Sequence, residues 1–283
     1  MPRASDVPVE VVVNVEIAPG CFSLRLSGPS AIGRFRHGQF LMLGWAEGLD
    51  PFLPRAMSIR GAKCEVRSAK CEVEILYKVY GRGTALLAGM RPGRIIRALG
   101  PLGNAFEVPR SATEILLVAG GIGVPPIAAL AESLASRRTS RRTEIIVFLG
   151  GKSKADLLCI ADFERAGAEV HVATEDGSSG FRGLVTELLE QFLRTSPPGV
   201  RTSHLAPRTV LYACGPPLML SSLSGIAEKH DLPYQASLEA NMACGFGACV
   251  GCVVPVVGGE GHQTYRLVCK DGPIFDGRKI LWE

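Results

Sequence analysis

The chain has 283 residues, of which 47% are hydrophobic and 20% charged, and its formal net charge at pH 7 is +4. This composition is typical of a soluble globular protein, and the length favours two domains plus a small appendage. The longest uncharged run, residues 115–131, is broken by glycine and proline pairs, so we expect no membrane span. The N-terminus has no apolar segment of the kind that a secretory signal has.

The basic run at residues 137–142 has no interleaved aromatic residues, so we expect a solvated loop and no nucleic-acid partner.

The first hundred residues have the pattern of a small antiparallel β-barrel. Apolar or alternating runs separated by glycine and proline predict strands at residues 9–16, 21–27, 40–45 and 72–80. About six strands of this kind close a small barrel. We place this barrel domain at residues 1–109, with Pro109 at its boundary.

Two motifs in this segment suit a nucleotide cofactor. The first is Arg55-Ala56-Met57-Ser58, whose guanidinium offers a fork for phosphate and whose hydroxyl can bond a flavin ring. Residues i and i+3 of a strand face opposite sides, so Arg55 and Ser58 need a turn or twist to serve one ligand. The second is a strand-to-helix turn at Gly81, Gly83 and Thr84, where exposed N–H groups suit a pyrophosphate. Thr84 equally fits a plain helix N-cap.

The order and close succession of these motifs resemble the ferredoxin-reductase-type flavoprotein superfamily, in which R-x-[YF]-S followed by G-x-G-T binds FAD at the barrel face. Met57 stands where many members carry Tyr or Phe, which removes a stacking ring. The resemblance implies an FAD site made of Arg55, Ala56, Met57, Ser58, Leu76, Tyr77, Lys78, Gly83 and Thr84.

From Thr113 the pattern changes to alternating strands and helices. The predicted strands are 114–119, 144–149, 169–173, 209–213 and 234–238, and the predicted helices are 126–136, 155–166, 184–193 and 217–229. This alternation predicts a doubly wound parallel sheet, which we assign to an NAD-binding domain at residues 110–232.

Two glycine-containing turns of this domain are candidates for binding NAD. Gly120-Gly121-Ile122-Gly123 follows the first strand, and Pro126 stands where a third glycine of the usual fingerprint would be. Proline is tolerated in the first turn of a helix, so the turn can still bind a phosphate, although a plain βα turn is the alternative. Cys214-Gly215 ends the fourth strand, and in the resembling superfamily this segment lies beside the nicotinamide. Cys214 could equally be a small buried hydrophobic residue.

A glycine-rich cysteine motif follows near the C-terminus. Cys244, Cys249, Cys252 and Cys269 have the C-x4-C-x2-C spacing with a distant fourth cysteine that is typical of a plant-type [2Fe–2S] cluster. Intervening glycines let a short loop take positive φ and bring N–H groups toward the sulfurs. Structural zinc is the alternative, but it more often uses two C-x2-C knuckles. We assign this metal site to a cluster subdomain at residues 233–283.

The remaining cysteines are odd in number, which fits a reducing cytoplasm better than a disulfide framework. They are Cys21, Cys64, Cys71, Cys159 and Cys214.

These cofactors together predict an electron relay. A nicotinamide exchanges two electrons as hydride and a cluster exchanges one, so a flavin is needed to connect them. None of the five histidines lies in a recognisable acid–base motif, and we assign no catalytic residue to this chain.

The order of the modules, with the segments 242–252 and 269–275, resembles the electron transfer subunits of the two-subunit, NAD-dependent dihydroorotate dehydrogenases. The resemblance implies a heterotetramer with FMN-containing catalytic subunits, on which dihydroorotate is oxidised in pyrimidine biosynthesis. Electrons would then pass through the [2Fe–2S] cluster and FAD to NAD+. The alternatives are a related NAD(P)H-dependent reductase for ferredoxin, sulfur or another acceptor, and a zinc-stabilised binding module.

Overall fold

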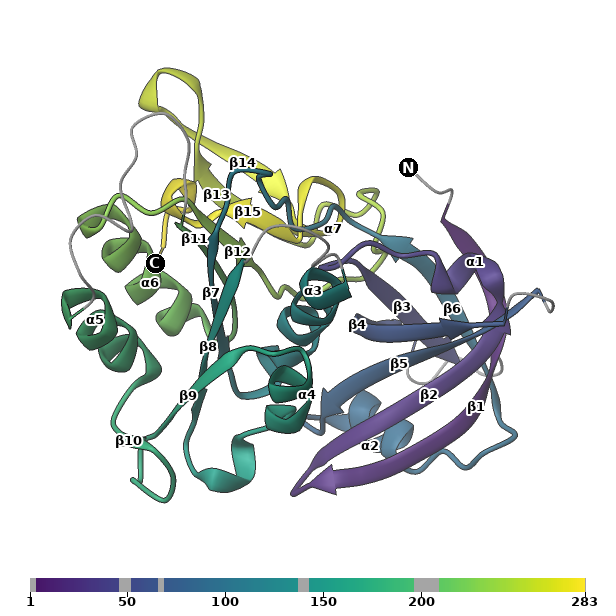
Figure 1. The fold of residues 1–283 in the computed structure, drawn as a ribbon. Helices are drawn as coiled ribbons and strands as arrows, with labels where there is room; N and C mark the ends of the chain where they lie inside the picture. Colours follow the sequence, from purple (N-terminus) through teal and green to yellow (C-terminus); the bar gives the residue numbers. More distant parts are fainter. Residues whose placement is uncertain (1–3, 46–51, 66–68, 137–142, 196–208, 283) are drawn as a thin grey trace. The chain divides into compact units, whose positions relative to one another are not determined.

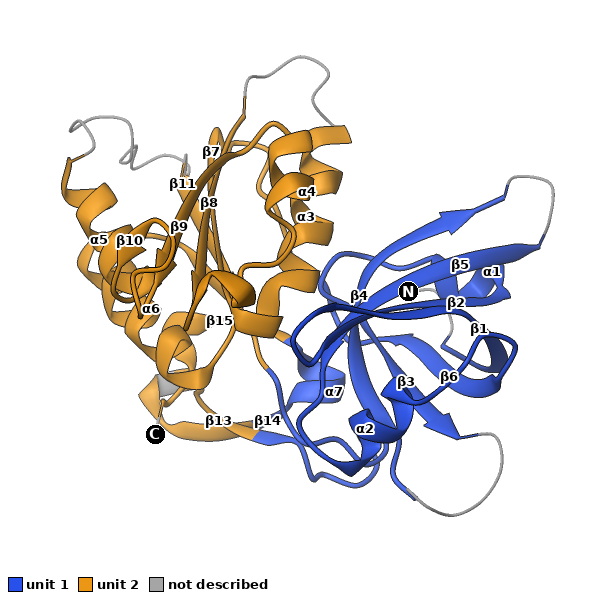
Figure 2. Ribbon diagram, turned by 90° about the horizontal axis from the view of Figure 1, so that it is seen from below, with its two compact units in different colours: residues 1–105, 239–253, 266–273 blue, residues 106–238, 254–265, 274–283 orange. Residues whose placement is uncertain are grey.

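A computed structural model describes the whole chain except residues 1–3, 46–51, 66–68, 137–142, 196–208 and 283. The chain forms two compact units, coloured in Figure 2. Unit 1 comprises residues 1–105, 239–253 and 266–273, and unit 2 comprises residues 106–238, 254–265 and 274–283. The division into domains at 1–109, 110–232 and 233–283 stays a prediction.

Unit 1 contains a closed antiparallel barrel, which confirms the predicted fold (Figure 1). The strand order is β1-β2-β5-β4-β3-β6. The strands are β1 (Ser5–Ala18), β2 (Cys21–Pro29), β3 (Phe40–Trp45), β4 (Arg55–Cys64), β5 (Lys70–Lys78) and β6 (Ile95–Leu102). The alternating sequence explains the burial: on β2, Leu24 and Leu26 are fully buried in the barrel core, while Arg25 between them is exposed.

Two short helices are fastened to this barrel. Helix α1 (Ser30–Gly33) inserts Ile32, which is fully buried in the barrel core. Helix α2 (Arg82–Ala88) is held by Asn14, whose side-chain amide donates hydrogen bonds to the carbonyl oxygens of Leu87, Ala88 and Met90. Asn14 therefore supplies a hydrogen-bond donor to carbonyl oxygens at the end of the helix, which have no partner within the helix.

Unit 2 contains the predicted parallel sheet, in the order β10-β9-β8-β7-β11-β12-β15. Its strands are β7 (Glu114–Gly120), β8 (Glu144–Gly151), β9 (Glu169–Thr174), β10 (Phe181–Arg182), β11 (Thr209–Cys214), β12 (Tyr234–Ser237) and β15 (Ile274–Asp276). Its helices are α3 (Val124–Ser136), α4 (Ile160–Arg165), α5 (Val185–Thr195) and α6 (Pro217–Lys229). Helices α3 and α4 cover one face and α5 and α6 the other, so every residue of the central strand β7 is buried (Figures 1 and 2).

Two features of the C-terminal segment did not emerge from the sequence pattern. Strand β15 joins the edge of the sheet antiparallel to β12, with Ala236 opposite Phe275. Strands β13 (Val253–Val257) and β14 (Gln263–Leu267) form a two-stranded sheet, and helix α7 (Val268–Asp271) follows it. The segments that carry the four motif cysteines belong to unit 1, together with the barrel.

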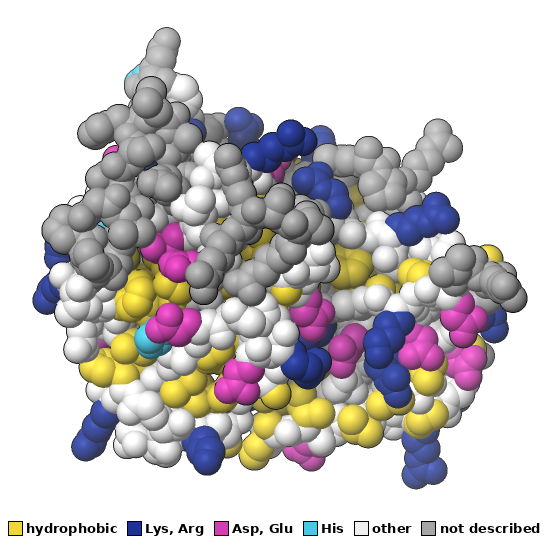
Figure 3. All heavy atoms as spheres, in the orientation of Figure 1, with side chains coloured by type: hydrophobic (Ala, Val, Ile, Leu, Met, Phe, Trp, Pro, Cys, Tyr) yellow, Lys and Arg dark blue, Asp and Glu magenta, His cyan; other side chains and the backbone are white. Residues whose placement is uncertain are grey.

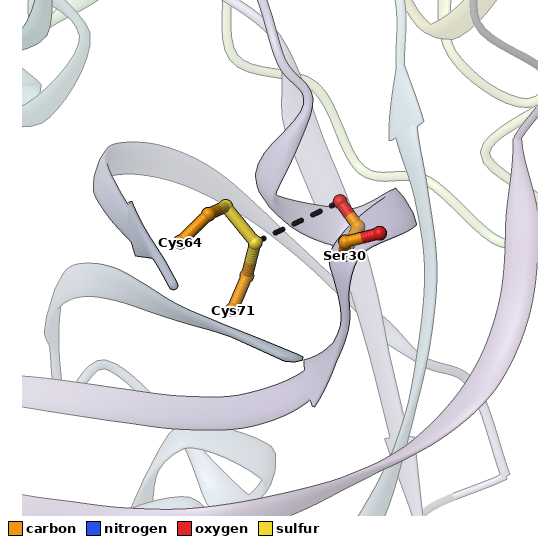
Figure 4. The surroundings of a disulfide bond; sticks show 3 residues. All are labelled: Ser30, Cys64 and Cys71. Atoms are coloured by element: carbon orange, nitrogen blue, oxygen red, sulfur yellow. Dashed lines mark hydrogen bonds between the residues drawn. A yellow bond between two sulfur atoms is a disulfide. The ribbon is translucent and has the colours of Figure 1, made fainter. Parts of the chain in front are cut away.

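The odd number of remaining cysteines argued against a disulfide framework, but two of the five are bridged. Cys64 and Cys71 form a disulfide between β4 and β5 (Figure 4). They lie opposite each other at the last pair of the β4–β5 ladder, and this register brings their side chains together. A spacing of seven residues along the chain does not reveal this pairing, because it depends on the hairpin register.

The molecular surface is mixed in charge. On the face drawn in Figure 3, Lys and Arg side chains are interspersed with Asp and Glu. The basic run at residues 137–142 lies outside the described residues. None of the helices in the described part of the chain has both the length and the hydrophobicity that a membrane crossing requires.

Candidate functional site

The structure arranges the four motif cysteines as two pairs. The backbone N–H groups of Ala248 and Cys249 point to the sulfur of Cys244, with N–S distances of 3.3 and 3.5 Å. The backbone N–H of Cys269 donates to the sulfur of Cys252 at 3.4 Å. The loop is therefore already folded so that backbone dipoles point at the sulfurs, as a negatively charged cluster requires.

The surroundings of Cys244 and Cys269 shift the pKa values of their thiols in opposite directions. Although burial opposes ionisation, the backbone N–H groups of Cys249, Phe246 and Ala248 lower the pKa of the Cys244 thiol to about 6. Burial and the adjacent Cys252 thiol raise the pKa of Cys269 to about 12. The backbone N–H groups therefore favour the thiolate form of Cys244, whereas burial favours the thiol form of Cys269 in the absence of a metal.

Gly245 and Gly247 of the cysteine loop occupy positions where a larger residue would be strained and would collide with neighbouring side chains. Gly245 has a φ of +79°, and a Cβ there would lie 2.4 Å from Cγ of Met42. Gly247 has a φ of +90°, and a Cβ there would lie 2.8 Å from Cδ of Lys270. Glycine takes such angles without a steric penalty, so both the turn and the close packing of this loop depend on it.

The paired donors fit a binuclear cluster. A [2Fe–2S] cluster takes four cysteine thiolates, and backbone N–H···S bonds link Cys249 to Cys244 and Cys269 to Cys252. Among the described residues, no three His, Cys, Asp or Glu side chains gather closely enough to hold a metal ion. The choice of a cluster over zinc therefore rests on the spacing of the four cysteines.

The two predicted flavin motifs meet in unit 1. A Cβ on Gly83 would lie 2.4 Å from Nε of Arg55, so the guanidinium group lies directly against the Gly83 backbone. Arg55 also donates to the carbonyl oxygen of Leu53 at 2.6 Å. The hydroxyl of Thr84 accepts hydrogen bonds from the backbone N–H groups of Tyr80 and Gly81, so Thr84 stabilises the start of α2. A cationic fork and a turn before a helix therefore lie together, which suits a pyrophosphate.

The other predicted flavin residues lie on strands β4 and β5. Met57 is in the barrel core, whereas Ala56 and Ser58 alternate with it and lie on the other face of β4. Tyr77 is also in the core, where its hydroxyl donates to Oδ1 of Asn14 at 3.0 Å, and burial raises its pKa to about 12. Contacts of Met57 and Tyr77 with a cofactor would therefore involve their backbone. Leu76 is buried and Lys78 half-buried.

The cluster loop packs against a strand next to the flavin motif. Met42, whose side chain touches Gly245, lies on β3 directly opposite Ala56 of β4. Residues opposite each other in an antiparallel pair point to the same side of the sheet. The iron-binding loop and the face of β4 that carries Ala56 and Ser58 are therefore neighbours within unit 1. No sequence signal indicated this contact of Met42, because the apolar pattern of a buried strand does not reveal which segment covers its outer face.

The two predicted NAD turns meet in unit 2. Their strands, β7 and β11, are adjacent at the point where the strand order of the sheet reverses, which is where open α/β sheets bind ligands. A Cβ on Gly123 would lie 2.4 Å from the carbonyl oxygen of Cys214 and 2.7 Å from the nitrogen of Gly215. Gly121 has a φ of +52° and open space around it, and Cys214 is buried.

The start of helix α3 completes this turn. The helix begins at Val124, so Pro125 and Pro126 both lie in its first turn, where a missing N–H costs no intrahelical bond. Met219 of α6 supports the turn, because a Cβ on Gly120 would lie 2.6 Å from its sulfur and one on Gly215 2.5 Å from its methyl group. The sequence offered no signal for Met219.

Both predicted modules match known families. Residues 239–281 match the iron–sulfur cluster binding domain of dihydroorotate dehydrogenase B, and residues 117–224 match the oxidoreductase NAD-binding domain. The chain is 32% identical to the dihydroorotate dehydrogenase B (NAD(+)) electron transfer subunit of Desulforamulus reducens, over all of both chains. It is 39% identical to the subunit of that name from Bacillus caldolyticus, over 94% of each chain.

Solved structures share the fold. A structure of an NADH-dependent reduced ferredoxin-NADP oxidoreductase, studied for flavin-based electron bifurcation, superposes with a TM-score of 0.79 at 26% identity, over 97% of this chain and 90% of that one. A ferredoxin NADP+ reductase from Neisseria gonorrhoeae with bound FAD and NADP gives a TM-score of 0.60 at 20% identity, over 80% and 91% of the chains.

Proposed function

Because the chain belongs to the family of electron transfer subunits of dihydroorotate dehydrogenase B, we propose that its three cofactor sites form one path between NAD and a catalytic partner subunit. The chain is an oxidoreductase component whose cofactors are NAD, FAD and a [2Fe–2S] cluster. The bound groups supply hydride transfer at the nicotinamide, conversion between paired and single electrons at the flavin, and single-electron transfer at the cluster.

Within this proposal, unit 1 holds FAD. Arg55 and the N–H groups at Gly83 and Thr84 bind the pyrophosphate, which is supported by the contact between the guanidinium and Gly83. Ala56, Ser58 and the backbone of residues 76–78 line the flavin ring. The observation that carries the path is the contact of Gly245 with Met42, because it places the iron-binding loop beside the strand that holds the flavin.

Unit 2 holds NAD at the reversal point of its sheet. Gly120, Gly121 and Gly123 let the backbone approach the dinucleotide phosphates at the start of α3. Cys214 and Gly215 hold the nicotinamide end. The support is the tight packing of these two turns, which leaves no room for a side chain at Gly123.

We further propose that the catalytic partner is an FMN-containing subunit that oxidises dihydroorotate, and that both subunits assemble as a heterotetramer. The residue that abstracts the substrate proton would lie on that partner. The surface around the cluster loop suits this contact: Cys249 is exposed, and Phe246, Val250 and Val253 are 57%, 62% and 50% exposed. Large apolar side chains gathered around a redox centre are a feature of docking surfaces.

A cytoplasmic location is part of the proposal. It is supported by Cys21, Cys159 and Cys214, which are not disulfide-bonded, whereas the Cys64–Cys71 disulfide is of a kind that is rare in a reducing compartment.

The test separates electron transfer within the chain from transfer to the partner. Cys249→Ser should lower the iron and sulfide content and abolish dihydroorotate-dependent NAD+ reduction with the FMN subunit, while FAD stays bound and NADH still reduces a dye. Cys159→Ser, in unit 2, is the matched control. If Cys249→Ser supported the normal rate with the partner, the path through the cluster would be refuted.

The docking surface is tested separately. Phe246→Asp should weaken binding of the FMN subunit without lowering the iron and sulfide content, because the side chain is exposed and does not ligate the cluster. Association is measured by size-exclusion chromatography with light scattering. Unchanged association would refute the proposed surface but leave the cofactor sites untouched.

A further inference from the structure

The disulfide lies at the opposite ends of β4 and β5 from the proposed flavin residues. Strand β4 runs from Arg55 to Cys64, and β5 runs from Lys70 to Lys78, so Cys64 ends one strand and Cys71 lies near the start of the other. The two cysteines form the last pair of the ladder. The sulfur bridge therefore fastens together the two strands that carry the proposed flavin residues.

Helix α1 is packed on this sulfur pair (Figure 4). A Cβ on Gly33 would lie 2.6 Å from the sulfur of Cys64 and 2.6 Å from that of Cys71, so only glycine fits there beside the bridge. The backbone N–H of Ser30 donates to the carbonyl oxygen of Ala69, just before β5. The neighbouring Ile32 is fully buried in the barrel core. The bridge, α1 and the core are thus in direct contact.

The two cysteines differ in exposure and in their neighbours. Cys64 is an exposed residue, whereas Cys71 is 2% exposed. The sulfur of Cys71 lies 3.8 Å from the carbonyl oxygen of Ser30 (Figure 4). A bridged sulfur has no hydrogen to donate, but a free Cys71 thiol would find an acceptor at this position. The reduced state therefore has a hydrogen-bond partner already in place.

We propose that Cys64–Cys71 is a reversible thiol–disulfide exchange site, reduced by a dithiol and coupled to the retention of FAD by the barrel. A thiolate of the dithiol attacks the sulfur of Cys64, the more exposed residue of the pair, the S–S bond breaks, and Cys71 leaves with the electron pair and takes up a proton. The second thiolate of the dithiol then attacks the dithiol sulfur that is bonded to Cys64. The Cys64 thiolate leaves and is protonated. The protein gains two electrons and two protons, and the dithiol becomes a disulfide.

The consequence for FAD follows from the strands. Opening the bridge frees the ends of β4 and β5 beside α1, while the same two strands hold Arg55 and residues 76–78 at their other ends. A cross-link limits the unfolded states available to the segment it closes, so its loss makes opening of the barrel easier. This coupling rests on the proposed FAD site, whereas the exchange reaction itself does not.

The exchange is tested on the full chain purified anaerobically with its FAD and cluster. The protein is treated with diamide or dithiothreitol and trapped with N-ethylmaleimide, and the peptides containing Cys64 and Cys71 are analysed by mass spectrometry. We expect a bridged pair after diamide and two alkylated thiols after dithiothreitol, without unfolding. Alkylation of both cysteines after diamide, or a bridge that survives dithiothreitol in the folded protein, would overturn the proposal. This readout needs neither FAD nor NAD, so it is independent of the proposed function.

The coupling is tested by the rate at which FAD leaves at elevated temperature, followed by flavin fluorescence. We expect FAD release about tenfold faster from the reduced protein than from the bridged one. The double variant Cys64→Ser/Cys71→Ser should release FAD at the fast rate in both conditions, and Cys159→Ser should behave like the wild type. Equal rates for the reduced and bridged wild type would refute the coupling, even if the double variant does not fold.

Discussion

Replacing Gly245 by alanine tests whether the cluster loop depends on its packing against β3. Two costs add at this position. Alanine in the left-handed region costs about 1–2 kcal/mol, and inserting a Cβ 2.4 Å from Cγ of Met42 adds an overpacking cost of about 1–3 kcal/mol. Gly261 isolates the first cost, because it has the same φ of +79° but nothing within 4 Å of an added Cβ. We expect Gly245→Ala to cost about 2–5 kcal/mol and Gly261→Ala about 1–2 kcal/mol.

The assay is the rate of cluster loss in mild denaturant, followed by visible absorbance and by iron and sulfide content. If the strain at Gly261 does not reach the cluster loop, because Gly261 belongs to unit 2, the combined cost of about 2–5 kcal/mol corresponds to cluster loss about 30- to 5000-fold faster in Gly245→Ala than in Gly261→Ala. Met42→Ala should partly restore the cluster of Gly245→Ala, because it removes the side chain that collides. Equal rates of loss in the two glycine variants, or no restoration by Met42→Ala, would refute the packing argument.

Three further predictions follow from single contacts. Gly123→Ala should raise KM for NADH at least about tenfold, since its Cβ meets backbone atoms that cannot move aside cheaply, whereas Gly225→Ala, in open space on α6, should not change KM in steady-state kinetics. Asn14→Ala should lower the free energy of unfolding by about 1–3 kcal/mol in denaturant titrations, because it removes the amide that donates to the carbonyl oxygens of Leu87, Ala88 and Met90; no change would contradict that role. Arg55→Gln should weaken FAD binding at least about tenfold by flavin titration, while Arg25→Gln, which alters only an exposed ion pair, should bind FAD normally.

The chemistry of this protein could be predicted from local sequence. Cys244, Cys249 and Cys252 lie within one short loop, so their spacing alone limits which metal centre they can hold. The change from alternating apolar residues to alternating strands and helices likewise predicted a barrel followed by a parallel sheet, and the structure confirms both. These properties are visible in sequence because they depend on neighbours along the chain.

Other features depend on which strands pair and in what register, and this is decided by many weak contacts between distant residues. The register of β3 with β4 places Met42 opposite Ala56, and the register of β4 with β5 joins Cys64 to Cys71. Strand β15 was missed for a related reason: a three-residue strand has too few residues to show a period and forms only where an open sheet edge accepts it. Local spacing was thus enough to predict the cofactors, whereas the contact of the cysteine loop with β3 appears only in the folded chain, because proximity between distant segments is set by packing and not by spacing along the chain.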